Sequence, residues 1–201
     1  MGEPRLQAEH DDAVLVKAVI QGEMMAFKKL INKYEKLVNS IVYKMVGQIQ
    51  DREDISQETF LRVYKYLPSF KFKSRLSTWI GNIAFNLCIN FLKKKKPHLL
   101  DDMYKPGVDS QEETYNIHVE IKDQSPLPDE SLFEKEKQQF LFKAIEDLNP
   151  VERTLLQLFH HEELSIEEIS IITTIPVNTV KSHLFRTRIK LKDQLTKILN
   201  S

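Results

Sequence analysis

Aromatic, basic and amide side chains are interleaved over residues 69–96. The first part of this stretch, SFKFKSRLS, places Phe70 beside Lys71 and Lys73. The second part, residues 77–96, is an apolar run that contains asparagines and ends in four lysines. Aromatic rings stack on unpaired bases, lysines neutralise phosphates, and an asparagine amide can donate to and accept from a base edge. The stretch therefore indicates non-covalent binding of single-stranded nucleic acid.

On a helical wheel of about 100° per residue, the amide side chains of the second part share one narrow face. This face contains Trp79, Asn82, Asn86, Asn90 and Lys93. The rest of the wheel is mostly apolar, so we expect a helix that is buried except along this amide stripe of three asparagines. Such a surface suits a base that is already unpaired or flipped out of the duplex. The alternative is that Trp79 and the phenylalanines belong to the core, and that the asparagines bond to loop carbonyls.

A second candidate site lies in LSIEEISIITTIPVNTVKSHLFRTRIKLK, residues 164–192. Ser165 and Glu168 form a capping-box pattern that predicts the start of a short helix. Residues 173–175 are expected to form a turn, and Pro176 favours the start of another helix. The segment therefore predicts a helix-turn-helix.

The second helix of this unit has an inward face and an outward face. The inward face contains Val180, Leu184, Thr187 and Leu191. The outward candidates for DNA contact are Thr179, Lys181, Ser182, Phe185 and Arg186. Cations can bind phosphates or guanine edges in the major groove, and Phe185 can contact a thymine methyl group. The alternative is an exposed amphipathic helix with extended lysines.

The elements that must position these residues are helical, because helical periodicity dominates the chain. Helices are expected at 12–21, 23–46, 51–67, 77–95, 131–147 and 150–161, followed by two short helices. The fold class is therefore all-α. Residues 97–130 carry four prolines, nine acids and no sustained period, which predicts a flexible acidic linker. It would join two small helical domains, residues 1–96 and 131–201, the second containing the helix-turn-helix.

The expected helix at 51–67 has an apolar side and a charged side. The apolar side contains Ile55, Thr59, Val63 and Leu67. The other side includes Asp51, Asp54, Glu58 and Leu61. The default interpretation is a solvated charged face. The alternative, which Leu61 within it favours, is a protein-docking surface.

Charge and composition restrict the function classes. The 29 basic and 29 acidic residues balance, but residues 59–96 hold nine Lys or Arg and no acid, and the chain turns basic again after residue 169. Two basic blocks around an acidic spacer indicate two polyanion-binding surfaces. Cys88 is the only cysteine, and it lies in an apolar run, so it is expected in the core.

Enzymatic activity is not expected. The sequence has no phosphate loop, no metal-ligand spacing and no nucleophile with a base, and His160 and His161 are interpreted as surface residues at a helix end. No metal and no cofactor are therefore expected. The polar, acidic N-terminus and the absence of a long apolar run predict a cytoplasmic protein without membrane insertion.

Taken together, these segments resemble the extracytoplasmic-function (ECF) class of bacterial RNA polymerase sigma factors. The resemblance is carried, in this order, by DREDISQETFLRVYKYLPSF, STWIGNIAFNLCINFLKKKK and LNPVERTLLQLFHHEELSIEEISIITTIPVNTVKSHLFRTRIKL. It covers nearly all of the chain outside the linker. It implies a protein that binds core RNA polymerase and directs promoter recognition, DNA opening and transcription initiation. Promoter DNA and an anti-sigma factor are the further partners that it implies.

The resemblance also implies a role for each surface. The first domain, called region two in that family, would bind core RNA polymerase through Asp51, Asp54, Gln57, Glu58 and Leu61. A flipped base of the minus-ten element would be captured by the loop and stripe, with Phe70, Lys71, Lys73, Asn82, Asn86, Asn90 and Lys93. The second domain, region four, would place its outward residues in the major groove of the minus-35 element.

One feature departs from the family pattern, and one alternative stays open. The loop FKFKSRLS lacks the glycine and the acid that are often found there. The alternative is a stand-alone helix-turn-helix transcriptional regulator whose N-terminal domain senses a ligand or partner. That alternative predicts stable binding to duplex DNA without polymerase.

Overall fold

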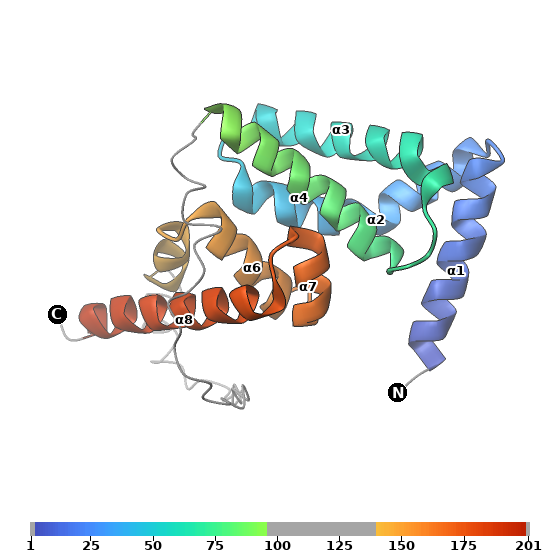
Figure 1. The fold of residues 1–201 in the computed structure, drawn as a ribbon. Helices are drawn as coiled ribbons and strands as arrows, with labels where there is room; N and C mark the ends of the chain where they lie inside the picture. Colours follow the sequence, from blue (N-terminus) through green and yellow to red (C-terminus); the bar gives the residue numbers. More distant parts are fainter. Residues whose placement is uncertain (1–2, 96–139, 200–201) are drawn as a thin grey trace, which may run out of the picture.

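The structure is a computed structural model that describes residues 3–95 and 140–199 (Figure 1). Within these ranges it contains helices and no strand, which confirms the all-α fold class. The elements are α1 (Glu3–Ile20), α2 (Met24–Met45), α3 (Ile49–Tyr66), the 3-10 helix η1 (Leu67–Ser69), α4 (Leu76–Lys95), α6 (Pro150–His160), α7 (Ile166–Thr173) and α8 (Val177–Leu199). Residues 140–146 are also helical. The expected linker, residues 97–130, lies outside the described residues.

Helix α2 forms the centre of the N-terminal half. Its apolar residues recur at three- and four-residue steps, and Leu30, Val38, Ile41 and Val42 are fully buried. Helices α3 and α4 pack against α2, and α4 also packs against α3. The expected inward face is confirmed, because Ile55, Thr59 and Val63 of α3 and Leu67 at the start of η1 are all buried.

Helix α1 is attached to α2 by a buried carboxylate. Asp12 accepts hydrogen bonds from the Tyr34 hydroxyl at 2.6 Å and from Lys33 Nζ at 2.6 Å. Burial, followed by the bond to Asp12, raises the pKa of Tyr34, so the phenol remains a donor. The helix begins at Glu3, earlier than the expected residue 12. The added turns contain good helix formers, so the helix continues beyond the apolar period that marked it.

Two capping boxes begin the helices of the C-terminal half. Asn149 accepts from the Glu152 amide at the start of α6, and Ser165 accepts from the Glu168 amide at the start of α7. The turn after α7 passes through Thr174, which has a left-handed φ of 58°. These features confirm the helix-turn-helix.

The last helix is longer than expected. The sequence predicted two short helices at the end of the chain. Helix α7 is short, with 8 residues, but α8 spans 23 residues to Leu199. No Gly or Pro follows residue 176, so nothing in the chain stops the helix after its apolar face has been buried.

The two halves share one hydrophobic core. Buried residues of α2 and α4 belong to the same cluster as Leu158, Ile169 and Ile172 of the C-terminal half. Figure 1 shows α4 lying between α3 on one side and α7 on the other. At Gly81 of α4, an added Cβ would lie 3.2 Å from the Ile172 side chain. None of the described helices is long and apolar enough to cross a membrane.

Candidate nucleic-acid interface

The loop before α4 carries an aromatic cluster. The Phe70 ring lies 4.7 Å from the Phe72 ring and 5.1 Å from the Trp79 ring, measured between centroids. Phe70 and Trp79 are half-buried and pack against the core, whereas Phe72 is 52% exposed. Phe70 and Trp79 therefore anchor the cluster to the protein core, and the exposed ring of Phe72 can stack on a nucleobase.

Phe72 also has an unusual backbone conformation. Its φ is 53°, in the left-handed region where a side chain costs about 1–2 kcal/mol and glycine costs little. The sequence lacks a glycine in this loop, and the structure shows the consequence: the loop keeps its turn with a strained phenylalanine. The contact with Phe70 offsets part of that strain.

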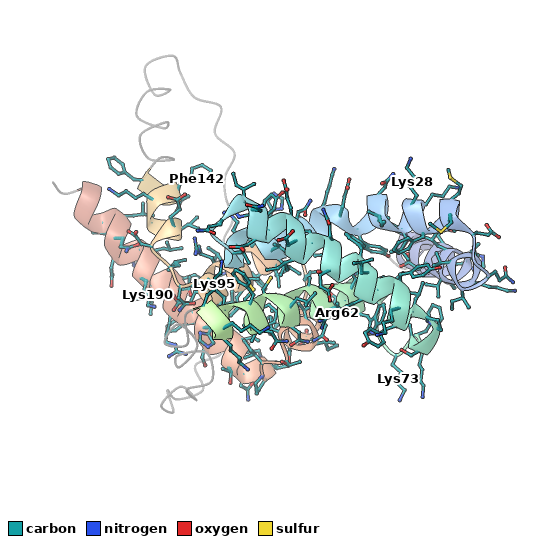
Figure 2. All side chains as sticks on the ribbon, turned by 90° about the horizontal axis from the view of Figure 1, so that it is seen from above. Lys28, Arg62, Lys73, Lys95, Phe142 and Lys190 are labelled. Carbon is teal, nitrogen blue, oxygen red and sulfur yellow. The ribbon has the colours of Figure 1, made fainter. Side chains whose placement is uncertain are left out.

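Cations lie at both ends of α4. Lys71 and Lys73 are exposed in the loop before the helix, and Lys93 is exposed in its last turn. Figure 2 shows Lys73 and Lys95 at opposite ends of this region. Lys95 already pairs with Asp51 of α3, at 2.8 Å. The remaining cations can bind phosphates of one strand on either side of the amide stripe.

The amide stripe is oriented as expected but is partly occupied. Asn82 and Asn86 are half-buried, and Asn90 is exposed. Asn82 Nδ2 donates to the carbonyl oxygens of Ile171 and Ile172, at 3.0 and 2.9 Å. Asn86 Nδ2 donates to Asn82 Oδ1 at 3.1 Å. The asparagines therefore form a connected row, and its first member is bonded to the end of α7.

Arg75 is a second contact between the halves, and the sequence analysis did not include it among the site residues. Its Nη1 donates to Glu168 Oε1 at 3.0 Å, while Glu168 Oε2 accepts from the Ser165 amide at 3.0 Å. Burial alone would raise the pKa of Glu168, but the hydrogen bonds from Ser165 and Arg75 outweigh it and lower that pKa. In the sequence, Arg75 was one of the cations interleaved with Phe70 and Phe72, but nothing there indicated a contact with the other half of the chain.

The outward face of α8 is exposed, as expected. Lys181, Phe185 and Arg186 are exposed, and Thr179 and Ser182 are half-buried. The inward face is confirmed, because its four residues are all buried. Ser182 Oγ donates to the Asn178 carbonyl, so its hydroxyl oxygen can still accept. We call Thr179, Lys181, Ser182, Phe185 and Arg186 the duplex face.

The outward face of α3 is also accessible. Asp54, Gln57 and Leu61 are exposed, and Glu58 pairs with Arg62 one turn away, at 2.7 Å. Asp51, which pairs with Lys95, is half-buried at the edge of this surface. We call Asp51, Asp54, Gln57, Glu58 and Leu61 the docking face. An apolar side chain among carboxylates suits binding to a protein with a basic, partly apolar surface.

Other predicted features have simple structural roles. Cys88 is buried in the core, and burial raises its pKa to about 12, so the thiol is not reactive. His160 and His161 are exposed at the end of α6, as expected. Within residues 3–95 and 140–199, no group of three or more acidic, His or Cys side chains could hold a metal ion.

Comparison with known families gives two matches, one in each half of the chain. Residues 30–98 match Sigma-70 region 2, and residues 141–191 match Sigma-70, region 4. The first match contains α3, the loop and α4, and the second contains the helix-turn-helix.

Similar proteins cover nearly the whole chain. The ECF RNA polymerase sigma factor SigW of Bacillus subtilis is 33% identical over 90% of this chain and 94% of its own length. The ECF RNA polymerase sigma-E factor of Escherichia coli strain K12 is 34% identical over 88% of this chain and 90% of its own.

Two solved structures share the fold. The structure of CnrH in complex with the cytosolic domain of CnrY has a TM-score of 0.61 and 15% identity, and covers 94% of this chain and 98% of that one. The sigma factor RpoE of Bartonella quintana, in complex with the anti-sigma factor NepR, has a TM-score of 0.57 and 22% identity, with 85% and 96% covered. With the sequence relatives, these matches show that the chain belongs to the ECF class of RNA polymerase sigma factors and directs transcription initiation.

Proposed function

We propose that the chain recognises promoters with two chemically different surfaces while it is bound to core RNA polymerase. One surface, on the loop and α4, takes an unpaired strand, and the duplex face of α8 takes the upstream element. The observation that carries the proposal is this contrast: exposed cations beside Phe185 on one helix, and an aromatic cluster beside an amide stripe on another.

The single-strand surface reads the minus-ten element in this proposal. Phe70 and Phe72 form an apolar wall, Asn86 and Asn90 present amides, and Lys71, Lys73 and Lys93 neutralise phosphates. Extruding a base costs a few kcal/mol of unstacking, so the surface must supply stacking and edge hydrogen bonds together. Asn82 joins this row once the end of α7 has left it.

The duplex face enters the major groove of the minus-35 element. Lys181 and Arg186 are five residues apart on the exposed side of α8, where they can reach guanine edges or phosphates. Phe185 supplies an apolar contact beside them, and Thr179 and Ser182 supply short hydroxyl groups. The inward face is fixed by its buried residues, which keeps these side chains pointed outward.

The docking face of α3 binds core RNA polymerase, and the chain has no catalytic activity of its own. An anti-sigma factor is a further partner, because a similar fold is seen in complex with one. The protein acts in the bacterial cytoplasm, where its polymerase and promoter are found. Residues 1–96 and 131–201 serve as its two functional domains, joined by residues 97–130.

The test is promoter-dependent transcription with purified core polymerase, comparing the parent chain with Asn86→Ala. The parent should initiate at specific promoters, and the variant should lose discrimination at one downstream base, by about tenfold, while binding core polymerase normally. Asn90→Ala, on the same stripe, should instead lose discrimination at the neighbouring base. Identical base rankings by Asn86→Ala and the parent would exclude Asn86 as a base reader. Tight, specific duplex footprints without polymerase would favour a stand-alone regulator instead.

A further inference from the structure

A cleft lies where α1, the loop before α4 and α7 meet. Its volume is about 360 Å³, and Lys73, Arg75, Thr78 and Glu168 are among its lining residues. Thr78 is only 1% exposed, and its Oγ1 has no hydrogen-bond partner among the described residues. A buried hydroxyl without a partner is costly, so the cleft contains an unfilled polar position.

The chemistry of this cleft suits an anion. It combines the guanidinium of Arg75, the ammonium of Lys73, the orphan hydroxyl of Thr78 and the first turn of α4, whose amide groups have no partner within the helix. The Asp12 carboxylate also lines the cleft, but it already accepts from Lys33 and Tyr34. In this structure the anion is a carboxylate, because Glu168 of α7 bonds to Arg75 at 3.0 Å. A phosphate of a DNA strand carries the same sign of charge and can accept from the same donors.

The amide stripe is blocked by the same helix. The Ile171 and Ile172 carbonyls that accept from Asn82 belong to the last turn of α7, where helix carbonyls lack an intrahelical partner. The Asn82 amide therefore caps the end of α7 with the donor group that it would offer to a base. Close packing supports the contact, because Gly81 leaves room for the Ile172 side chain.

Building on the proposed function of the α4 surface, we propose that α7 is an internal competitor of the single DNA strand. The Glu168 carboxylate takes the place of a DNA phosphate at Arg75. The carbonyl groups at the end of α7 accept the hydrogen bonds that the Asn82 amide would otherwise donate to a base. The strand and α7 cannot use these groups at the same time. In this closed form the helix-turn-helix domain prevents the chain from capturing unpaired DNA.

Both other surfaces remain accessible in the closed form. Helix α3, which carries the docking face, lies on the side of α4 away from α7 (Figure 1), and the duplex face of α8 includes exposed side chains. Polymerase can therefore bind before α7 leaves. To release α7, polymerase must bind the open form, in which α7 has left α4, more tightly than the closed form, by enough to compensate for the lost apolar contacts between the two helices. Exposure of the base-reading surface is then coupled to assembly with polymerase.

The first test compares Glu168→Gln with Glu167→Gln in the full chain. Gln at 168 keeps the capping box of α7 but removes the charge that pairs with Arg75. Glu167 is exposed in the same turn, so its substitution makes the same change in net charge. With a labelled pool of random single-stranded DNA of about 12 nucleotides, Glu168→Gln should bind about fivefold more tightly than Glu167→Gln.

The second test measures closure without DNA. Gly81→Ala places a methyl group 3.2 Å from the Ile172 side chain, closer than an ordinary contact, and should weaken the packing of α7 on α4, whereas Gly47→Ala adds a methyl group that meets nothing within 4 Å. Small-angle X-ray scattering should give a larger radius of gyration for Gly81→Ala than for Gly47→Ala. Alanine is a better helix former than glycine, so α4 itself should not be weakened.

Two results would overturn the competition. One is equal affinity of the two glutamine variants for single-stranded DNA, and the other is a larger radius of gyration for Gly81→Ala without tighter binding of single-stranded DNA than by Gly47→Ala. Failure of the proposed function looks different: the parent chain would then give no promoter-dependent transcription with core polymerase. If the parent is active in transcription but the two glutamine variants bind single-stranded DNA equally well, the competition is rejected and the proposed function stands.

Discussion

The two surfaces proposed to touch DNA differ in what covers them. The duplex face of α8 is open to solvent, and its basic side chains point away from the protein. The base-reading surface of α4 is bonded to α7 through Asn82 and bordered by the Arg75–Glu168 ion pair. One helix-turn-helix domain therefore presents its own nucleic-acid surface while covering that of the other half.

The two surfaces thus differ in whether DNA can reach them, and not only in the side chains that they carry. Both helices carry side chains proposed to contact DNA, but only α8 presents them without a rearrangement. The contact that covers α4 includes buried apolar residues, and these contribute more to stability than one partly exposed ion pair. The ion pair and the amide hydrogen bonds therefore determine which groups of α4 and its loop are blocked. The apolar contact determines how firmly α7 is held on α4.

The largest effect should come from removing the apolar contact. Ile172 is fully buried and touches the position of Gly81, so Ile172→Ala should lower the free energy of unfolding by about 2–4 kcal/mol. Denaturant titration of the full chain measures this, and a loss of cooperativity between the halves is expected with it. Ile171→Ala is the control, because Ile171 is 50% exposed and should cost under about 1 kcal/mol. Equal losses in both variants would contradict the assigned contact.

The second effect concerns the open surface. Arg186→Ala should reduce transcription that depends on the upstream promoter element by about tenfold, the worth of one good base contact. Promoters that lack this element should be unaffected. Lys28→Ala removes a charge from an exposed residue of α2, far from α8 (Figure 2), and should change neither promoter class. A uniform loss on both promoter classes would assign Arg186 to general phosphate binding instead.

Sequence periodicity predicted the faces of individual helices well. The inward residues of α3 and α8 are buried as expected, because each helix needs to bury one apolar stripe against its neighbours. The capping box at Ser165 was also predicted, since it depends on residues only three positions apart.

Contacts between the halves were not predictable in this way. Arg75 and Glu168 lie 93 positions apart, and neither residue type indicates its partner. A wheel assigned Asn82 to the exposed stripe, but it cannot show that another helix end covers that stripe. Helix ends were also missed at α1 and α8, where good helix formers extend beyond the apolar period.

A third, smaller effect concerns the strained loop. Phe72→Ala keeps the left-handed backbone and loses the ring, whereas Phe72→Gly loses the ring and the strain together. The glycine variant should therefore be more stable than the alanine variant by about 1 kcal/mol in denaturant titration. Both should bind single-stranded DNA equally weakly if the ring is the stacking surface. A glycine variant no more stable than the alanine variant would exclude strain at this position.

The smallest effect is the pH dependence of the ion pair that borders the covered surface. The pKa of Glu168 is lowered in the folded protein, so its contribution to stability is present above the unfolded value of about 4.3 and is lost as pH falls below it. The side chains of Arg75 and Glu168 are 37% and 17% exposed, so solvent screens the pair and limits this contribution to under about 1 kcal/mol. Glu168→Gln keeps the cap but cannot titrate.

The parent should accordingly be slightly more stable than Glu168→Gln at neutral pH, and the difference should shrink toward zero near pH 3. Asp12 lines the same cleft, but it is present in both proteins, so its contribution cancels in the comparison. Paired denaturant titrations across this range measure the difference directly. A constant difference at every pH would show that the carboxylate charge contributes nothing to closure, and that α7 is held on α4 by its apolar contact and its amide bonds alone.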